Sequence, residues 1–318
     1  MSKRLLTYII LAAAAVTASC TKNTVDLPYG GAISFAPVAE KSTKAIIEGT
    51  TYPEGESFKV SAYHGGTDPY FVNLTADYSL TQNGTKLWET SSAQYWPLEG
   101  SLTFHAYSPA SASGVSITSA GVTATGYTVK NAAQMTTDLC YGSYTVADCA
   151  SHPESVPLQF SHALAQVVFR VKAASYYENT SLSMTSLSMD GICSVGDFTG
   201  SAWENQNTEF NYALHGISTV LTYDGTTPVT TDVCSYLFVP QTLGPNASIN
   251  VGYSVDFGGG RTLNNSPVKV ALGGTITEWV PGKKYIYTLN IGLDNVITIS
   301  ASTVGWSDQG YNIIVEES

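Results

Sequence analysis

Hydrophobic and polar residues alternate in short runs along most of the chain. The clearest run covers residues 57–63, in which Phe58, Val60 and Ala62 fall on one face of an extended strand. Glycine, asparagine, aspartate and proline separate such runs at a spacing of roughly 8–12 residues. No helical or heptad periodicity is sustained over any long stretch. The pattern therefore predicts an all-β protein made of β-sandwiches.

Two segments depart from simple alternation. Ser161 can cap one helical turn over residues 162–165, because a serine oxygen accepts a backbone hydrogen bond where a helix begins. This turn is the one helix that we predict outside the N-terminal signal. The alternation over residues 181–189 slips at Thr185-Ser186, which indicates a β-bulge or a kink in that strand.

The strand pattern pauses once, around residues 152–154. The chain that remains after the first 19 residues is long enough for one large or two ordinary β domains. We therefore predict two sandwich domains, the first over residues 32–155 and the second over residues 156–318.

The N-terminal residues have the features of an export signal. Two basic residues precede an apolar run over residues 5–16, and small residues lead directly to Cys20. The run is shorter than the roughly 20 apolar residues that a permanent membrane helix needs. Because this ending is similar to a bacterial lipobox, we predict a signal peptide over residues 1–19, a lipidated Cys20 and a polar tether over residues 20–31. The alternative is cleavage without lipidation, which leaves a free cysteine.

Composition and charge narrow the class of protein. Charged residues make up only 12% of the chain, while tyrosine, serine, threonine and glycine are abundant, as in extracellular β proteins. The 25 acidic residues outnumber the 14 basic ones and give a net charge of -11. Because nucleic-acid binding needs clustered cations, this balance argues against a nucleic-acid partner.

Four cysteines follow Cys20 and leave two possibilities open. An exported protein with an even number of cysteines can form disulfides. Cys140 and Cys149 could close a hairpin and leave Cys193 and Cys234 as a longer-range pair, although four cysteines allow three pairings. Buried thiols without disulfides are the alternative, since a domain of this size does not need cross-links to fold.

No residue pattern predicts catalysis, a metal site or a cofactor. The five histidines are scattered and form no H-E-x-x-H motif, and no G-x-S-x-G motif is present. For His162 we predict a packing or hydrogen-bonding role rather than a catalytic one. We therefore expect a protein that is not an enzyme and that needs no cofactor.

Aromatic residues beside prolines and glycines suggest one binding function. Tyr95, Trp96, Trp203, Trp279 and Trp306 could form a platform on which sugar rings stack. The alternative is that these side chains pack in the cores or at the rims of the sandwiches. An exposed cluster would indicate a surface lipoprotein that binds glycans without polymerising, which is our second hypothesis for the function.

Six short phrases carry a family resemblance. They are YWP at residues 95–97, LTFHAYSP at 102–109, LQFSHALA at 158–165, FVPQ at 238–241, WVPGKKYIY at 279–287 and the stretch over 299–306. In this order after a lipobox, they resemble the fimbrillin family of Gram-negative anaerobes (type V pilus subunits, Mfa-like), which builds pili from lipoprotein precursors. The likeness covers nearly all of the chain after the signal peptide.

The resemblance implies an architecture and a route of assembly. It implies two tandem transthyretin-like β-sandwiches in an outer-membrane lipoprotein that reaches the cell surface as part of a fimbrium. A trypsin-like protease would cut after a basic residue in the loop that follows the first strand, here marked by Ile33 and Phe35. The bond between Lys44 and Ala45 matches the place where the family often has Thr-Arg-Ala, and Lys41 is the alternative site. A protease strict for arginine would spare a lysine at this position.

The C-terminal residues are a candidate donor strand. Tyr311, Ile313 and Val315 fall on one face of the run over residues 310–316. A sandwich that lacks one strand exposes an apolar groove and unpaired backbone groups, and a strand from the next subunit can fill both. The alternative is that the tail pairs within its own domain. The expected partners are other fimbrillin subunits, the outer membrane through the lipid, and surface ligands of host or bacterial cells.

Overall fold

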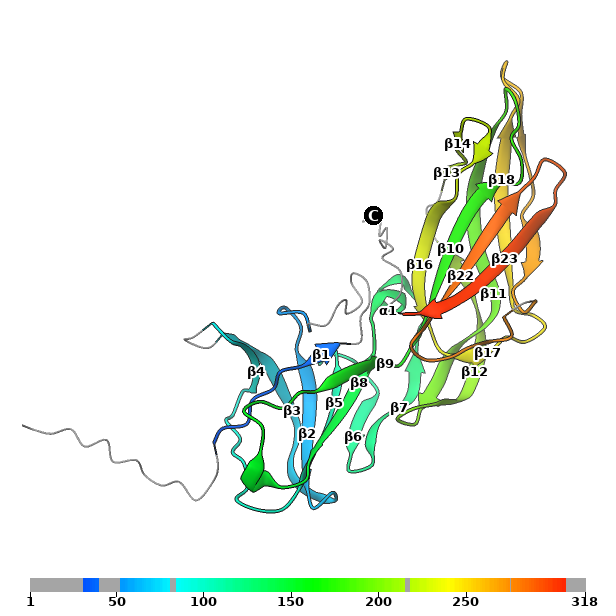
Figure 1. Cartoon of the computed structure of the whole chain (residues 1–318). Helices are drawn as coiled ribbons and strands as arrows, with labels where there is room; N and C mark the ends of the chain where they lie inside the picture. Colours follow the sequence, from blue (N-terminus) through cyan, green and yellow to red (C-terminus); the bar gives the residue numbers. More distant parts are fainter. Residues whose placement is uncertain (1–30, 40–51, 81–83, 215–217, 275, 307–318) are drawn as a thin grey trace, which may run out of the picture.

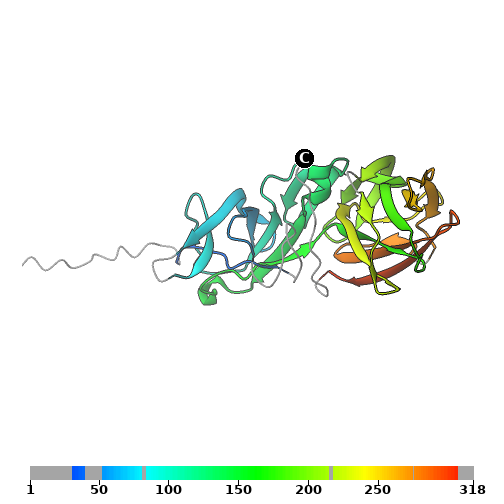
Figure 2. The same cartoon turned by 90° about the horizontal axis from the view of Figure 1, so that it is seen from above.

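The computed structural model describes residues 31–39, 52–80, 84–214, 218–274 and 276–306 (Figure 1). Its described residues form 23 β-strands and two short helices, which confirms the all-β class. Figures 1 and 2 show an elongated molecule, with the first strands of the sequence at one end and those after β10 (Ala165–Ala173) at the other. The described part of the chain contains no helix with the length and apolarity needed to cross a bilayer.

A seven-stranded sheet, called the first sheet below, forms the end of the molecule that contains the earliest strands. Its strands are, in spatial order, β1 (Val38–Ala39), β9 (Gln159–His162), β8 (Cys140–Val146), β5 (Leu102–Ser108), β2 (Phe58–His64), β3 (Asp68–Leu80) and β4 (Lys86–Thr90). Neighbouring strands pair antiparallel, except that β1 runs parallel to β9. As predicted from the alternation, Phe58, Val60 and Ala62 are fully buried in the core of this sheet.

Two further sheets share a second hydrophobic core. The second sheet has the order β16 (Thr231–Phe238), β10, β22 (Lys283–Ile291) and β23 (Ile297–Gly305). The third sheet has the order β19 (Thr262–Asn264), β18 (Ser248–Asp256), β11 (Ser181–Phe198), β7 (Gly121–Thr128) and β6 (Val115–Thr118), with β12 (Trp203–Leu214) and β13 (Thr219–Val220) beside β11 and β20 (Val268–Ala271) beside β18. Two small ribbons pair β14 (Tyr223–Asp224) with β15 (Thr227–Pro228) and β17 (Gln241–Thr242) with β21 (Glu278–Trp279).

The third sheet combines strands from both halves of the sequence. The long strand β11 pairs with β18 through residues 181–190 and with β7 through residues 195–198. The hairpin of β6 and β7 also touches the first sheet, because the Tyr63 hydroxyl donates a hydrogen bond to the Ile117 carbonyl at 3.2 Å. Figure 1 shows this hairpin between the two ends of the molecule.

The two hydrophobic cores are interleaved along the chain. Met135 and Leu139 belong to the core of the second and third sheets, whereas Leu158 and Phe160 belong to the core of the first sheet. The boundary that we predicted between residues 155 and 156 therefore does not separate the two cores. The division into two domains itself stays a prediction.

The β-bulge that we predicted in β11 is confirmed. The pairing of β11 with β18 shifts register between Met184 and Ser186. Gly252 lies opposite Ser186, and a Cβ atom at this glycine would collide with the Ser186 hydroxyl. The glycine therefore makes room for the side chain that the bulge turns toward β18.

The helical turn that we predicted at residues 162–165 is wrong. Ser161 and His162 belong to β9, where they pair with β8, and β10 begins at Ala165. Backbone pairing with a neighbouring strand outweighs the local capping preference here. The α-helix in the described residues is instead α1 (Ala132–Thr136), and the second short helix is η1, a 3-10 turn (Cys149–Ser151).

A capping box, which the hydrophobic alternation did not predict, begins α1. The side chain of Asn131 accepts a hydrogen bond from the backbone N–H of Gln134, and the Gln134 side chain accepts one from the backbone N–H of Asn131. An Asn-x-x-Gln spacing is the sequence signal of this motif.

Candidate functional site

Residues 31–39, called the first segment below, lie between the two edges of the first sheet. Phe35 exchanges backbone hydrogen bonds with Trp88 of β4, one in each direction at 2.9 Å. On its other side, the Val156 N–H donates to the Ser34 carbonyl at 2.8 Å and the Ala36 N–H donates to the Val156 carbonyl at 2.9 Å. The first segment is therefore paired on both sides, like a central strand of a sheet.

Backbone bonds continue along the whole first segment. The Ile33 N–H donates to the Gln94 carbonyl at 2.7 Å, and the Val38 N–H donates to the Leu158 carbonyl at 2.7 Å. The segment ends in β1, which pairs with β9. At least seven backbone hydrogen bonds, besides the β1–β9 pairing, join the first segment to the rest of the protein.

The first segment also fills the core. Ile33 is 3% exposed and Phe35 is fully buried, so both residues that we predicted to mark the removable strand face the interior. The Phe35 ring meets the rings of Phe58 and Phe104 edge to face, with centroids 5.6 and 5.7 Å apart. Burial of such a side chain is worth about 1.5–3 kcal/mol, and each aromatic pair adds about 0.5–1.5 kcal/mol.

A second aromatic anchor lies where the described chain resumes. Tyr52 is fully buried, its ring lies 5.4 Å from that of Trp88 and 5.2 Å from that of Phe160, and its hydroxyl is 2.6 Å from the Ser108 hydroxyl. Burial raises the pKa of the Tyr52 phenol, which stays neutral at physiological pH. Tyr52 therefore packs in the same core as Phe35, since both rings contact Phe58, and it comes from the part of the chain that follows the predicted processing sites.

Several predicted site residues lie outside the described residues. They are the lipidation site Cys20, the processing residues Lys41, Lys44 and Ala45, and the candidate donor residues Tyr311, Ile313 and Val315. Their predicted roles stay predictions.

The aromatic platform that we considered for sugar binding is not formed. Trp96, Trp203, Trp279 and Trp306 are at most 8% exposed, and only Tyr95, at 37%, presents a substantial surface. Trp96 stacks on His152 with ring centroids 4.5 Å apart, and the Trp203 indole donates to the Ala163 carbonyl at 2.6 Å. The alternative of core and rim packing is therefore the one that the structure shows.

None of the four described cysteines forms a disulfide in this structure, which favours thiols over the pairs Cys140–Cys149 and Cys193–Cys234. The state of the cysteines stays a prediction. Cys140, Cys149 and Cys234 are buried, while Cys193 is half-buried. Burial raises the pKa of the thiols of Cys149, Cys193 and Cys234, which keeps them protonated and weakly nucleophilic.

His162 has the packing and hydrogen-bonding role that we predicted. Its Nδ1 atom lies 2.8 Å from Asp138 Oδ2, and its ring stacks on Trp306 at a centroid distance of 4.1 Å. Trp306 follows the edge strand β23 and is the last described residue of the chain. The contact therefore joins the end of the second sheet to β9 in the first.

Solved structures from three Bacteroides species share this fold. A fimbrial protein from Bacteroides vulgatus is similar with a TM-score of 0.58 at 17% identity, over 87% of this chain and 100% of that one. Two proteins assigned to cell adhesion are also similar. The one from Bacteroides uniformis has a TM-score of 0.52 at 14% identity, over 87% of this chain and 98% of that one. The one from Bacteroides ovatus has a TM-score of 0.50 at 15% identity, over 91% and 99%.

Sequence comparison identifies the family. A search of curated proteins found no match to this chain. The sequence profile of fimbrillin-like proteins, in contrast, matches residues 43–306, which is most of the chain. This match agrees with the phrases that carry the resemblance and with the shared fold of the fimbrial protein. The chain therefore belongs to the fimbrillin-like family.

Proposed function

We propose that this protein is a structural subunit of a surface fimbria that polymerises by strand exchange and supports adhesion. Membership of the fimbrillin-like family supports a pilus or adhesion subunit with a structural role. The observation that carries the exchange step is the first segment. It is bonded on both sides and buries Phe35, so its removal would open a continuous groove in the first sheet.

An emptied groove would be unstable and would take up a new strand. Loss of the first segment would leave backbone groups of Trp88, Val156 and Leu158 without partners. Each such buried group costs about 1–3 kcal/mol when it is unmet. A donor strand restores these bonds by β-augmentation and places apolar side chains where Ile33 and Phe35 were. Replacement by a strand of a neighbouring subunit would therefore hold the polymer tightly.

The proposed donor is the tail over residues 310–316. Its apolar residues Tyr311, Ile313 and Val315 repeat every second position, as do Ile33 and Phe35 in the first segment. An aromatic side chain in the donor could take the place of the Phe35 ring. Pairing of the tail within its own subunit is the competing arrangement.

We propose that cleavage after Lys44, or after Lys41, triggers the exchange. Both sites fall between the first segment and the buried anchor Tyr52. After a cut here, only non-covalent contacts would hold the first segment. The lipid on Cys20 would leave with it, so the same cut would release the subunit from the outer membrane.

Proteolysis of the chain that begins at Thr21, which retains every described residue, tests this proposal. Trypsin should produce a new N-terminus at Ala45 and a ladder of oligomers that resist SDS. Lys44→Ala should abolish the new N-terminus at Ala45, whereas Lys41→Ala should not. Because trypsin can still cut after Lys41, the ladder should be lost only when both lysines are replaced by alanine. Lys44→Arg should allow an arginine-specific protease, which should not cut the original chain after residue 44, to produce the same ladder.

Two outcomes would overturn the proposal. One is the absence of any cut near Lys44. The other is a cut that leaves a stable monomer, which would favour an anchoring role or the glycan-binding lipoprotein. A chain that ends at Trp306 identifies the donor: if it is cut but stays monomeric, the tail is the donor, and if it still polymerises, another strand is.

A further inference from the structure

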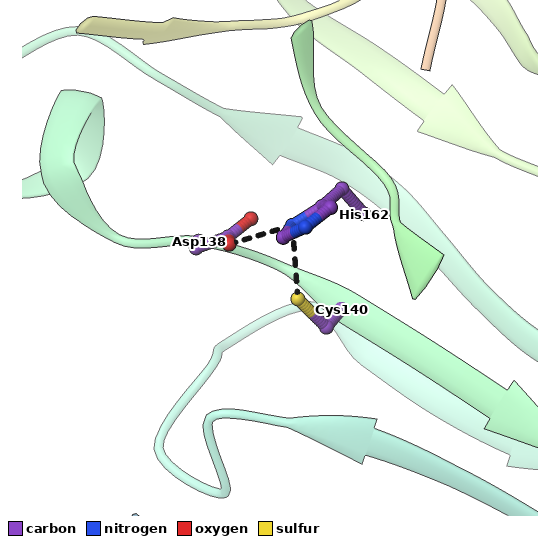
Figure 3. A group of neighbouring side chains, drawn as sticks. All are labelled: Asp138, Cys140 and His162. Carbon is purple, nitrogen blue, oxygen red and sulfur yellow. Dashed lines mark hydrogen bonds and ion pairs between the residues drawn. The ribbon is translucent and has the colours of Figure 1, made fainter. Parts of the chain in front are cut away.

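Three side chains with metal-binding atoms, those of Asp138, Cys140 and His162, meet in the interior of the protein (Figure 3). Trp306, which follows β23, stacks on the ring of His162. His162 Nδ1 lies 2.8 Å from Asp138 Oδ2 and 3.5 Å from Cys140 Sγ. The candidate ligand atoms of all three residues lie within 4.8 Å of one another. Asp138 is 6% exposed, Cys140 1% and His162 2%, so the cluster is shielded from solvent.

The strand register explains why these residues meet. Asp138 and Cys140 are two positions apart where the chain enters β8, so they lie on the same side of an extended backbone. Cys140 lies directly opposite His162 in the ladder between β8 and β9. Directly opposed side chains on neighbouring strands point the same way and approach closely. Spacing along the chain shows no metal motif here, because one ligand comes from a different strand.

The hydrogen bonds within the cluster leave two buried polar atoms without a partner. Asp138 Oδ1 and His162 Nε2 have no hydrogen-bond partner among the described residues. A buried carboxylate oxygen without a hydrogen-bond partner is costly, and such atoms in native proteins are usually matched by a bound water molecule or ion. Trp306 covers the His162 ring with an interplanar angle of 5°, which fixes the direction of its nitrogen atoms.

We propose that Asp138, Cys140 and His162 bind a zinc ion. A carboxylate, a thiolate and a neutral imidazole balance the charge of one divalent cation, so the loaded site is neutral and tolerates burial. Zinc bonds of about 2.3 Å to sulfur and about 2.0 Å to nitrogen place tetrahedral donors about 3.5 Å apart. The Sγ–Nδ1 distance of 3.5 Å already meets this geometry. The Nδ1–Oδ2 distance would lengthen by about 0.5 Å on binding.

The ion would act as a structural cross-link rather than a catalyst. Asp138 follows α1, Cys140 begins β8 and His162 ends β9, so one ion would tie three segments together. The unpartnered Asp138 Oδ1 can supply the fourth donor if the carboxylate binds through both oxygens. Closed coordination by protein ligands is typical of structural zinc sites. Because metal binding of this kind stabilises the folded state, occupancy would raise the melting temperature.

Cobalt and zinc binding to the chain that begins at Thr21 test the proposal. After removal of metal with a chelator, one equivalent of Co²⁺ should produce a thiolate-to-cobalt charge-transfer band and tetrahedral visible bands. Zinc should displace these bands and raise the melting temperature by about 3 °C or more. Cys140→Ser should remove the charge-transfer band and weaken zinc binding by about 100-fold or more, since even an outer-shell change costs about 10–100-fold.

A matched variant separates the cluster from other thiols. Cys234→Ser alters a buried thiol outside the cluster and should keep both the band and the zinc-induced stabilisation. Asp138→Asn tests a second ligand while preserving side-chain size, and far-ultraviolet circular dichroism checks that each variant folds. Absence of the charge-transfer band in the original chain would overturn the proposal. So would a band that persists in Cys140→Ser or disappears in Cys234→Ser.

Discussion

Phe35 and Trp88 donate a backbone hydrogen bond to each other, each at 2.9 Å, although they belong to distant parts of the sequence. Phe35 bonds in this way to β4 while its neighbours Ser34 and Ala36 bond to Val156. A short segment near the N-terminus thus completes the first sheet from one edge to the other. The proposed exchange depends on this pairing, and the predictions begin with it.

Phe35→Ala should destabilise the uncut chain by about 3–5 kcal/mol, because it removes a fully buried ring and its two edge-to-face contacts. Urea unfolding measures the effect. Val38→Ala in the same segment is the control, since Val38 is 38% exposed and its loss should change stability by less than about 0.5 kcal/mol. Similar losses in the two variants would mean that Phe35 does not anchor the first segment.

Gly142→Ala should loosen β9 from β8 and cost about 1–3 kcal/mol of stability. A Cβ atom at Gly142 would collide with the backbone carbonyl of Gln159 in the facing strand, which has no rotamer to relieve the contact. Hydrogen exchange should show faster exchange at Phe160 than in the unaltered chain. Gly55→Ala is the matched control, because a Cβ atom there meets nothing within 4 Å. Equal exchange in both variants would contradict the prediction.

Asp197→Asn should reduce stability at neutral pH and have little effect in strong acid. Asp197 accepts hydrogen bonds from the Gly126 backbone N–H at 2.7 Å and from the Asn205 side chain at 2.8 Å. These bonds hold the pKa of Asp197 below its usual value, and the bond from the Gly126 backbone has the larger effect. A lowered folded-state pKa contributes stability above the unfolded-state pKa, and this contribution is lost as pH falls through the folded-state value.

Urea unfolding at neutral and acidic pH measures this difference. The curves of the unaltered chain and of Asp197→Asn should converge on acidification. Asn205→Gly, which removes the second donor and tolerates the positive φ of 53° at this position, should show a smaller effect of the same sign on the pH dependence. A constant gap across the pH range would show that Asp197 acts through packing rather than through its charge.

The four described cysteines should react as thiols and not as disulfides. In the chain that begins at Thr21, unfolding without reductant should release four groups that react with a thiol reagent. Burial raises the thiol pKa of Cys149, Cys193 and Cys234. Of these three, Cys193 should react first in the folded state, because it is half-buried whereas the other two are buried. Peptide mass spectrometry after labelling identifies each site, and fewer than four reactive groups would reveal a disulfide.

Features that depend on local sequence were predicted well. Alternation places Phe58, Val60 and Ala62 in the core, and the slip at Thr185-Ser186 coincides with the register shift in β11. The capping box of α1 has a local signal, Asn131 followed three residues later by Gln134, but the helix it begins is short and lies between strand patterns that dominate the sequence.

Features that depend on pairing between distant strands were not predicted. The turn expected after Ser161 is absent because that residue pairs with Tyr141. The cluster of Asp138, Cys140 and His162 results from the register of β8 against β9, which no spacing along the chain reveals. The first segment shows the limit of local signals. Alternation predicts a strand that contains Ile33 and Phe35, but it does not reveal which strands form hydrogen bonds with it on either side.

The path of the chain between the sheets has a mechanical consequence. The chain leaves the first sheet after β5, adds β6 and β7 to the third sheet, returns for β8 and β9, and then enters the second sheet at β10. Three crossings therefore connect the two ends of the molecule, where a single linker would have allowed them to bend about one hinge. A pulling force along a fibre of such subunits would be divided among these crossings and the β7–β11 ladder. Each subunit would then resist extension as a stiff unit.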